Sequence, residues 1–397
     1  MYDPTSVHPF AENHRDLIFE VSEFVEAEIR PTVDATQPSD LLVGLARKIA
    51  QRWAGISVDP RYGGNGVGNV AKLAIIDTIA HHDPGVGGIA QALFLGQGPF
   101  LWAGTEEQKR KWLPPICSGE LIATIAVTEP AAGGDISNIE MTAERDGSDW
   151  ILIGEKSFVG NSNIADLHCV IARTPDGLAV FVVESWRSGL TLSEYVPSDG
   201  LEHFSFGRLV FDRCRVPAEN MLGGPGDGDA AGRATSMLIG RITIGALCLG
   251  IHRIIGDEAI AYSSGRILRG KPLAQRPKIR DDIARIQTNL GTAETLLYSA
   301  AHLLDQGLPA DTALCMAKLV GYEAAEDSAR RTKQLHGASG TLSSVRISKL
   351  RAAADAMFAP AGTSGAQLHL LSEMALNPDY VEWSQRFAER FPKVEAA

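Results

Sequence analysis

The 397-residue chain has few cysteines, and their arrangement excludes some classes of protein. Cys117, Cys169, Cys214, Cys248 and Cys315 are scattered, and no two of them form a C-x-x-C pair. Disulfide frameworks and cysteine metal sites need paired or closely spaced thiols. We therefore predict buried free thiols, a reducing cytoplasmic location and no metal site.

Basic residues and long apolar runs are also scarce. The chain has 37 Lys and Arg against 48 Asp and Glu, a formal net charge of −11. A general nucleic-acid role, which would need a basic face, is thereby disfavoured, while a local basic pocket for an anion stays open. No run of about 18 apolar residues predicts a membrane span. The first 16 residues have neither a basic n-region nor an apolar h-region, so we expect no signal peptide.

The first 120 residues have helical periodicity. Asn13 can cap the first amphipathic segment, and Ser39 begins a second one. A continuous helix is expected over residues 87–102. Thr105 then precedes two acidic and several basic residues, an order that suits a helix dipole. Residues 1–120 are therefore predicted to be an N-terminal helical domain.

The middle of the chain, residues 121–230, changes to short β-branched segments bounded by Gly, Asp, Ser or Pro. Their spacing predicts a compact β domain, a barrel or a sandwich. The glycine-rich stretch Gly223–Gly232 follows no βαβ unit and precedes no lysine, so it is predicted to be a flexible hinge rather than a phosphate-binding loop. The segments read as strands are IATIAV, WILIGEK, LHCVIAR, LAVFVVE and FGRLVFDR.

Residues 231–397 return to helical periodicity. Apolar and small residues recur every three or four positions from Ile279 to Leu297 and from Ala313 to Ala324. Long helices with small residues favour a four-helix bundle. The predicted fold class is α+β, in the order helical domain, β domain, helical bundle.

Four short motifs occur in a fixed order along this framework. They are Gly104-Thr105-Glu106-Glu107-Gln108-Lys109, Ala126-Val127-Thr128-Glu129-Pro130, Arg215-Val216-Pro217-Ala218-Glu219-Asn220 and Gly362-Thr363-Ser364. Each motif alone is weak evidence. Together, and with the predicted domain order, they make the chain resemble the acyl-CoA dehydrogenase family over nearly its whole length.

This resemblance implies a soluble FAD flavoprotein. Members of the family are usually homotetramers in which FAD lies between the β domain and the bundle and reaches a neighbouring subunit. The substrate is an acyl thioester of coenzyme A or of a carrier protein. A carboxylate removes the α-proton while a hydride passes from the β-carbon to the flavin, and hydrogen bonds stabilise the developing enolate.

The resemblance also assigns cofactor-binding roles residue by residue. Those near the flavin ring and the adjoining turn are Val127, Thr128, Gly134, Phe158 and Gly160; those near the pyrophosphate and the bundle are Arg266, Gln334, Gly337 and Thr363. Phe158 stands where tryptophan is common and can still offer an aromatic face. Gly160 stands where threonine is common, so we expect open space there. Arg269 replaces a usual phenylalanine, and a new anion contact and a solvated surface are equally open for it.

The family's catalytic base is missing. In one branch a glutamate precedes Gly-Thr-Ser, and that position is Ala361; in another it precedes an arginine on the first bundle helix, and that position is Gly240. Neither residue can accept a proton. The neighbouring Arg241 is retained as a candidate catalytic residue, and His336 and Asp355 are weak candidates for a replacement base.

Three functions follow from this departure. The first is an enzyme on an acyl thioester with non-standard chemistry, whose enlarged space at Ala361, Gly160 and Gly240 accepts a bulkier or more polar acyl group. The second is the non-catalytic partner subunit of a heteromeric dehydrogenase. The third is a flavin monooxygenase on the same fold. Fold analogy alone does not choose among them.

Overall fold

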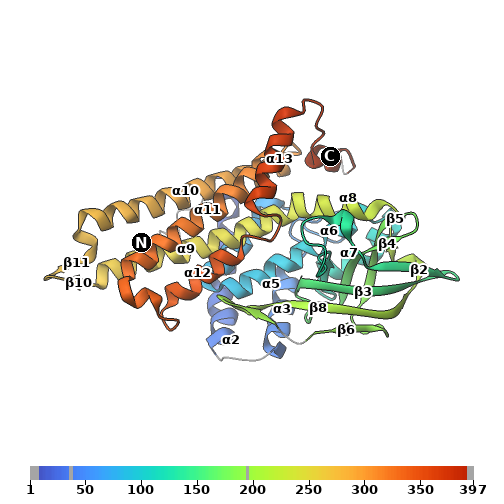
Figure 1. The fold of residues 1–397 in the computed structure, drawn as a ribbon, viewed down its shortest axis with the longest axis horizontal. Coiled ribbons are helices and arrows are strands. Elements are labelled where there is room, and N and C mark those ends of the chain that lie inside the picture. Colours follow the sequence, from blue (N-terminus) through green and yellow to red (C-terminus); the bar gives the residue numbers. More distant parts are fainter. Residues whose placement is uncertain (1–8, 35–38, 194–195, 391–397) are drawn as a thin grey trace.

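The computed structural model describes residues 9–34, 39–193 and 196–390, and it confirms the predicted fold class. In Figure 1 the bundle extends to the left and the β domain lies at the right, while helices of the N-terminal part lie at the bottom centre (α2 and α3) and between the two (α5). Helix α4 packs along α9 and α5 packs against β8, so the N-terminal helices contact both other parts of the chain.

The N-terminal part is entirely helical. Its elements are η1 (Pro9–His14), α1 (Arg15–Phe24), η2 (Val25–Ile29), α2 (Arg30–Asp34), α3 (Ser39–Trp53), η3 (Pro60–Tyr62), α4 (Asn69–His82), α5 (Pro84–Leu95), α6 (Gly98–Ala103) and α7 (Glu106–Cys117). The prediction at Thr105 is confirmed, because its side chain and that of Gln108 form a capping box at the start of α7.

Two predictions in this part are wrong. Asn13 does not cap α1, because it lies inside η1 and the N-cap residue is His14, which makes no side-chain cap hydrogen bond. The helix predicted over residues 87–102 is interrupted after Leu95. Strand β1 approaches so closely there that a Cβ on Gly96 would lie 2.0 Å from the Ala123 carbonyl oxygen. Periodicity carries no information about such a backbone approach.

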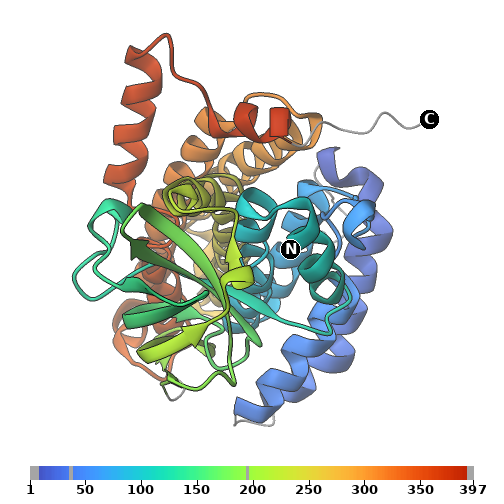
Figure 2. The ribbon, with the colours of Figure 1, turned by 90° about the vertical axis from the view of Figure 1, so that its right-hand side faces the viewer.

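The five predicted strands belong to one nine-stranded sheet in the order β6-β8-β3-β2-β4-β5-β9, with β1 paired to β4 and β7 paired to β8 (Figure 2). The strands β1 and β4 are parallel, and the long pair β3–β8 is antiparallel. The strands are β1 (Ala123–Ala126), β2 (Thr142–Asp146), β3 (Asp149–Gly160), β4 (Leu167–Thr174), β5 (Gly177–Glu184), β6 (Leu190–Leu192), β7 (Pro197–Ser198), β8 (Leu201–Val216) and β9 (Met221–Leu222), with η4 (Ile136–Asn138) and η5 (Ala218–Asn220) between them.

The predicted hinge at Gly223–Gly232 is mostly a helix. Helix α8 (Asp227–Ala234) begins at its fifth residue, and the Asp227 carboxylate accepts a hydrogen bond of 2.8 Å from the Gly224 amide. A Cβ on Gly228 would lie 2.7 Å from the Ala179 amide nitrogen. The glycines therefore allow α8 to press against strand β5, and the turn itself is limited to residues 223–226.

The C-terminal part is the predicted bundle. It consists of η6 (Thr235–Gly240), α9 (Arg241–Gly265), β10 (Ile267–Leu268), β11 (Lys271–Pro272), η7 (Leu273–Gln275), α10 (Pro277–Gln306), α11 (Asp311–His336), η8 (Gly337–Thr341), α12 (Arg346–Ala356), α13 (Ser364–Leu376) and α14 (Trp383–Arg390). Helices α9, α10, α11 and α12 pack together, whereas α13 projects from the body of the molecule (Figures 1 and 2).

One helical stretch of the described chain, Asp227–Gly265, is long and apolar enough to cross a membrane, but 94% of its apolar window is buried inside the fold. This is what the central helix of a packed core shows. The five cysteines are free and buried, as expected, and burial raises the pKa of Cys169 and Cys248. In the described residues no group of His, Cys, Asp and Glu could hold a metal ion.

Candidate functional site

The two positions at which a catalytic glutamate was expected meet at one point. Gly240 ends η6, and Ala361 lies in the turn between α12 and α13. A Cβ built on Gly240 would lie 3.4 Å from the Ala361 Cβ, 3.6 Å from the Thr235 carbonyl oxygen and 3.7 Å from Leu95 Cδ1. None of these three nearest groups can accept a proton at neutral pH. A glutamate from either position would therefore reach the same place.

The turn that contains Ala361 is held from its C-terminal side by a buried glutamine. Gln367 Nε2 donates to the carbonyl oxygens of Ala361 at 2.9 Å and of Gly362 at 3.0 Å. Its Oε1 accepts a 2.8 Å hydrogen bond from Arg241 Nε. Arg241 is 4% exposed, and burial lowers the pKa of its guanidinium. The arginine thus acts on the turn through Gln367, and the side chain that faces the position of a Cβ on Gly240 is the Ala361 methyl group.

A second buried cation holds the other side of the turn. Lys318 Nζ donates to the carbonyl oxygens of Met357 at 3.0 Å and of Phe358 at 2.9 Å. Burial lowers the pKa of this lysine to about 8. Ala361 has φ +57° and Gly362 has φ +94°, so the turn includes a non-glycine residue in the left-handed region. Such a conformation persists only where its surroundings hold it.

The Val127–Glu129 turn is organised in a similar way by Lys156 on β3. Lys156 is completely buried, and its Nζ donates to the Val127 carbonyl oxygen at 2.9 Å and to Glu129 Oε1 at 2.6 Å. Glu129 also accepts hydrogen bonds from the amides of Glu140 and Met141. Burial lowers the pKa of Lys156 to about 8 although Glu129 raises it. A satisfied buried ion pair therefore fixes the segment that bears Thr128.

Thr128 and Phe158 lie next to each other at this turn. The Ser157 amide donates to the Thr128 carbonyl oxygen at 2.8 Å, which places the preceding and following residues of β3 beside the turn. The Phe158 side chain is 73% exposed, at φ +54°. An exposed aromatic ring close in the fold to a threonine suits a planar heteroaromatic ring with a polar edge. The neighbouring Gly134 has no atom within 4 Å of a built Cβ, so that turn is open to a ligand.

The expected space at Gly160 is filled. A Cβ on Gly160 would lie 2.8 Å from Phe204 Cζ, and the Phe204 ring packs edge-on against Phe206 at 4.6 Å. A glycine is therefore needed at position 160 because the Phe204 ring occupies the space of a side chain. The motif around Gly160 gave no sign of this contact, since Phe204 is distant in the sequence. At Gly240 a built Cβ would meet only ordinary contacts, at 3.4 Å and beyond, so a side chain could be accommodated at Gly240 but not at Gly160.

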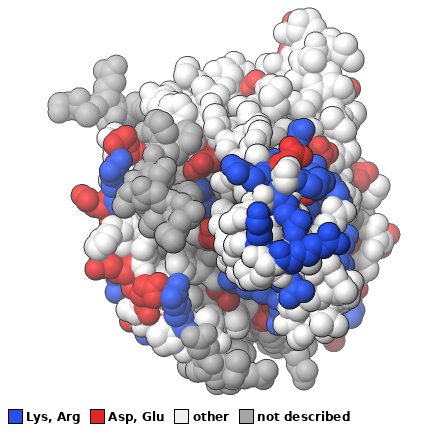
Figure 3. All heavy atoms as spheres, turned by 90° about the vertical axis from the view of Figure 1, so that its left-hand side faces the viewer, with Lys and Arg blue, Asp and Glu red and all other residues white. Residues whose placement is uncertain are grey.

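The other predicted cofactor residues lie at the far end of the bundle. Arg266 follows α9, Gln334 lies in the last turn of α11, and Gly337 comes directly after α11. The Tyr262 ring stacks on the His336 ring with 3.8 Å between centroids, which brings the two helix ends together. With 25 residues, α9 separates this end from Gly240 by about 37 Å. Figure 3 looks onto this end and shows Lys and Arg side chains gathered there; those on the β10–β11 hairpin and beside it include Arg266, Arg269, Lys271 and Arg276.

The remaining candidates have structural partners. Thr363 caps α13, and its Oγ1 accepts a hydrogen bond from the Ala366 amide at 3.3 Å. His336 contacts Glu258 at 3.0 Å at the far end of α9, and Asp355, 49% exposed, pairs with Arg351. Neither His336 nor Asp355 lies at the Ala361–Gly240 point. Sequence patterns missed three residues that hold these turns, namely Lys156, Lys318 and Gln367. The one signal available was a lysine within a predicted β-strand, at Lys156.

The residues present fit FAD. The open turn at Gly134, the exposed Phe158 ring and the Thr128 hydroxyl suit the ring system, and Arg266 with the exposed backbone at Gly337 suits a pyrophosphate. Gly337, at φ +59°, leaves α11 in a conformation that favours glycine and has no neighbour within 4 Å of a built Cβ.

Comparison with known proteins identifies the family of the whole chain. The models of the N-terminal, middle and C-terminal domains of acyl-CoA dehydrogenase match residues 11–120, 124–214 and 230–376. The chain is 31% identical to an acyl-CoA dehydrogenase of Bacillus subtilis, covering 90% of this chain and 96% of that protein. It is 33% identical to an L-prolyl-[peptidyl-carrier protein] dehydrogenase of Pseudomonas fluorescens, covering 75% and 83%.

Solved structures show the same relationship. Butyryl-CoA dehydrogenase from Megasphaera elsdenii superposes with a TM-score of 0.86 at 27% identity, over 94% of this chain and 99% of that one. The domain models cover most of the sequence, and their order is the order of the domains in the fold. The chain belongs to the acyl-CoA dehydrogenase family, whose members are FAD-dependent oxidoreductases.

Proposed function

We propose that the protein is an FAD-dependent enzyme that acts on an acyl thioester by non-standard chemistry, in which no protein carboxylate at the usual positions removes the α-proton. The observation that carries this proposal is the meeting of Ala361 and Gly240 at one point that has no proton acceptor among its nearest groups. A positioned general base contributes about 10²–10⁴ in rate. A substrate with an acidic α-proton, or a reaction other than simple dehydrogenation, does not need that contribution.

The chain's own residues would position the reactants. Bound FAD would supply hydride transfer. Thr128, Val127 and Phe158 would hold the ring system, and Gly134 would leave room in the adjoining turn. Arg241 is a positioning residue in this proposal, because it reaches the Ala361 turn through Gln367. The thioester is presented by coenzyme A or by a carrier protein, the two kinds of substrate named for the relatives.

The site is proposed to be completed by a second subunit. The predicted cofactor residues fall into two groups at opposite ends of α9, so Arg266, Gln334 and Gly337 would serve an FAD bound to a neighbour. The projecting α13 also exposes Leu368 by 56% and Leu376 by 82%, an apolar surface that a partner subunit would cover. A homo-oligomer, dimer or tetramer, in the cytoplasm is the arrangement we propose; a heteromer with a related subunit is its competitor.

The first test is the visible spectrum and native mass of the purified protein. We expect flavin absorption near one FAD per subunit in a homo-oligomer, and anaerobic loss of that absorption on addition of a thioester with an acidified α-carbon. A colourless protein that gains FAD only when co-expressed with a related subunit would point to a non-catalytic partner. Oxygen uptake that requires an added flavin reductase would point to a monooxygenase.

The second test addresses the shared cofactor site. Arg266→Ala should lower the FAD content of the purified oligomer, because a guanidinium that pairs with phosphate is removed. Arg269→Ala, on the same exposed hairpin, is the matched control and shows whether that arginine adds an anion contact. An unchanged flavin content in the Arg266 variant would remove this residue from the cofactor site.

A further inference from the structure

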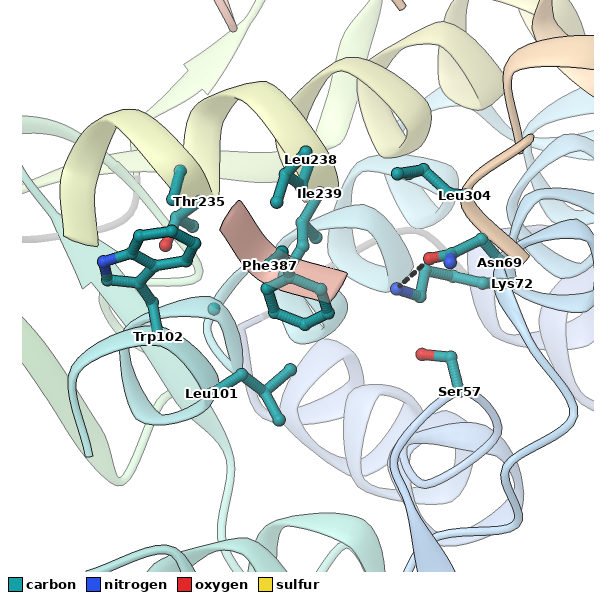
Figure 4. A pocket seen from close by; sticks show the side chains of 12 residues that line it. Ser57, Asn69, Lys72, Leu101, Trp102, Thr235, Leu238, Ile239, Leu304 and Phe387 are labelled. Carbon is teal, nitrogen blue, oxygen red and sulfur yellow. Dashed lines mark hydrogen bonds between the residues drawn. The ribbon is translucent and has the colours of Figure 1, made fainter. Parts of the chain in front are cut away.

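A pocket lies next to the Ala361–Gly240 point, between the N-terminal helices and the bundle. It has a volume of about 90 Å³, and residues of α4, α6, η6, α10 and α14 line it (Figure 4). Its walls are mainly apolar, with Leu101, Leu238, Ile239 and Phe387 around the middle (Figure 4). Lys72, Asn69 and Ser57 gather at one end, away from Thr235 and Trp102. The pocket therefore has an apolar body and a polar, cationic end.

The charge at that end is buried. Lys72 is 3% exposed, and its Nζ donates to Asn69 Oδ1 at 3.1 Å, which uses one of the three hydrogens of an ammonium group. Burial lowers the pKa of Lys72 to about 8, while the nearby Asp305 opposes this effect. The Asp305 oxygens accept hydrogen bonds from the Asn69 and Val70 amides at the start of α4. The interaction with Asp305 compensates part of the cost of burying this ammonium group, and Lys72 Nζ also lies 5.9 Å from the centre of the Phe94 ring. An anion hydrogen-bonded to the ammonium group would compensate more of that cost.

The pocket begins about one helical turn from the reaction point. Thr235 lines the pocket, and its carbonyl oxygen is 3.6 Å from the position of a Cβ on Gly240. Ile239, which precedes Gly240, also lines the pocket. The Thr235 hydroxyl is buried without a hydrogen-bond partner among the described residues. An acyl chain whose α-carbon lies beside Ala361 and Gly240 would therefore enter this pocket along η6.

We propose that this pocket binds the far end of the acyl group and that Lys72 selects chains that end in a carboxylate. This inference rests on the proposed thioester function and adds the class of substrate. A terminal carboxylate would accept charge-assisted hydrogen bonds from the Lys72 ammonium group in addition to its bond to Asn69, whereas a terminal methyl group would offer that ammonium group no acceptor. The small volume suits only the last few atoms of the chain.

The test measures binding to the FAD-loaded oligomer through the change in its flavin spectrum. The probes are pantetheine thioesters, which carry the arm that coenzyme A and carrier proteins share, in pairs of equal chain length ending in carboxylate or methyl. We expect wild type to bind the carboxylate-ended member of the best-fitting pair about 10–100-fold more tightly, as for a hydrogen bond to a charged group. In Lys72→Met this preference should disappear or reverse.

A matched control separates recognition from the general effect of removing a buried lysine. Lys109 on α7 is 4% exposed, burial likewise lowers its pKa to about 8, and it does not line the pocket. Lys109→Met should keep the wild-type preference. Equal binding of both members of every pair by wild type would overturn the inference even if no Lys72 variant folds, and so would a preference that survives in Lys72→Met. Failure of every thioester to bind would instead overturn the proposed function together with it.

Discussion

The Val127–Glu129 turn and the Pro360–Gly362 turn are held in similar ways but present different groups. A buried lysine donates to main-chain carbonyl oxygens at each: Lys156 to Val127, and Lys318 to Met357 and Phe358 just before the second turn. The first turn carries a threonine whose backbone adjoins the strand residue before the exposed Phe158. The second presents a methyl group. Hydrogen bonds to main-chain carbonyl oxygens hold each turn in place, and they do so whichever side chain the turn carries.

The largest expected effect comes from giving the second turn a functional group. Ala361→Glu and Gly240→Glu should each raise the rate of flavin reduction by a simple saturated acyl thioester by about 10²–10⁴, the usual contribution of a general base. Ala361 already has a positive φ, so a glutamate adds no new backbone strain, and a Cβ at Gly240 meets no atom closer than 3.4 Å. Anaerobic stopped-flow absorbance measures the rate.

The isosteric Ala361→Gln is the control and should give no gain. Because both positions reach one point, the double variant with two glutamates should be slower than either single variant at pH 7, since two adjacent carboxylates cannot both ionise easily. If neither single variant reduces flavin faster than the glutamine control, the site lacks more than a base.

The second largest effect is expected when the Val127–Glu129 turn loses the lysine that holds it. Lys156→Met leaves Glu129 buried without its cation and should lower the free energy of unfolding by about 3–5 kcal/mol, with loss of FAD. Chemical denaturation and flavin absorbance measure the two losses. Adding Glu129→Gln should recover part of the stability, because the uncompensated charge is removed. Full FAD content in Lys156→Met would show that the flavin ring does not depend on this turn.

A smaller effect is expected at the second turn. Gln367→Leu removes the bridge between Arg241 and the carbonyl oxygens of Ala361 and Gly362, and it should cost about 1–3 kcal/mol. In the Ala361→Glu background it should also reduce the gain in rate, because the glutamate is no longer held at the reaction point. Thermal unfolding and the same stopped-flow assay check this. An unaltered gain would remove Gln367 from the positioning of the turn.

The smallest expected effect is on the free energy of unfolding at acid pH, where a histidine of the sheet is compared with a histidine of the bundle. Burial lowers the pKa of His168 on β4 to about 4 and of His252 on α9 to about 3, from an ordinary 6.5. Both histidines take up protons more readily unfolded than folded, so their contribution to stability is present above pH 6.5 and is lost as the pH falls toward 4. His168→Leu should flatten this loss of stability, because it removes one of the two titrating groups. No hydrogen bond is lost with it, since the ring nitrogens of His168 have no hydrogen-bond partner among the described residues.

His252→Leu should behave differently from His168→Leu at neutral pH. His252 Nε2 lies 2.8 Å from Ser328 Oγ, so the leucine leaves that hydroxyl without this partner and costs stability. Denaturation curves from pH 4 to 8 for both variants and wild type test the comparison. Equal acid sensitivity in His168→Leu and wild type would contradict the assigned role of burial.

Much of the fold followed from local pattern, whereas its exceptions came from close packing. The change from helical to alternating periodicity predicted the helical, β and helical parts, and the motif at Thr105 predicted the start of α7. The break after Leu95 and the helix within residues 223–232 were missed because they depend on how closely β1 and β5 approach. Those are contacts between residues distant in sequence.

The sequence by itself determined which chemical groups are present: a threonine, a phenylalanine and an arginine for a flavin, and no carboxylate at either base position. Only the tertiary structure decided that Ala361 and Gly240, 121 positions apart, meet at one point, that Phe204 fills the space at Gly160, and that Lys72 faces a pocket beside them. Residue types set the available chemistry, but distances between side chains on different helices arise only when those helices pack.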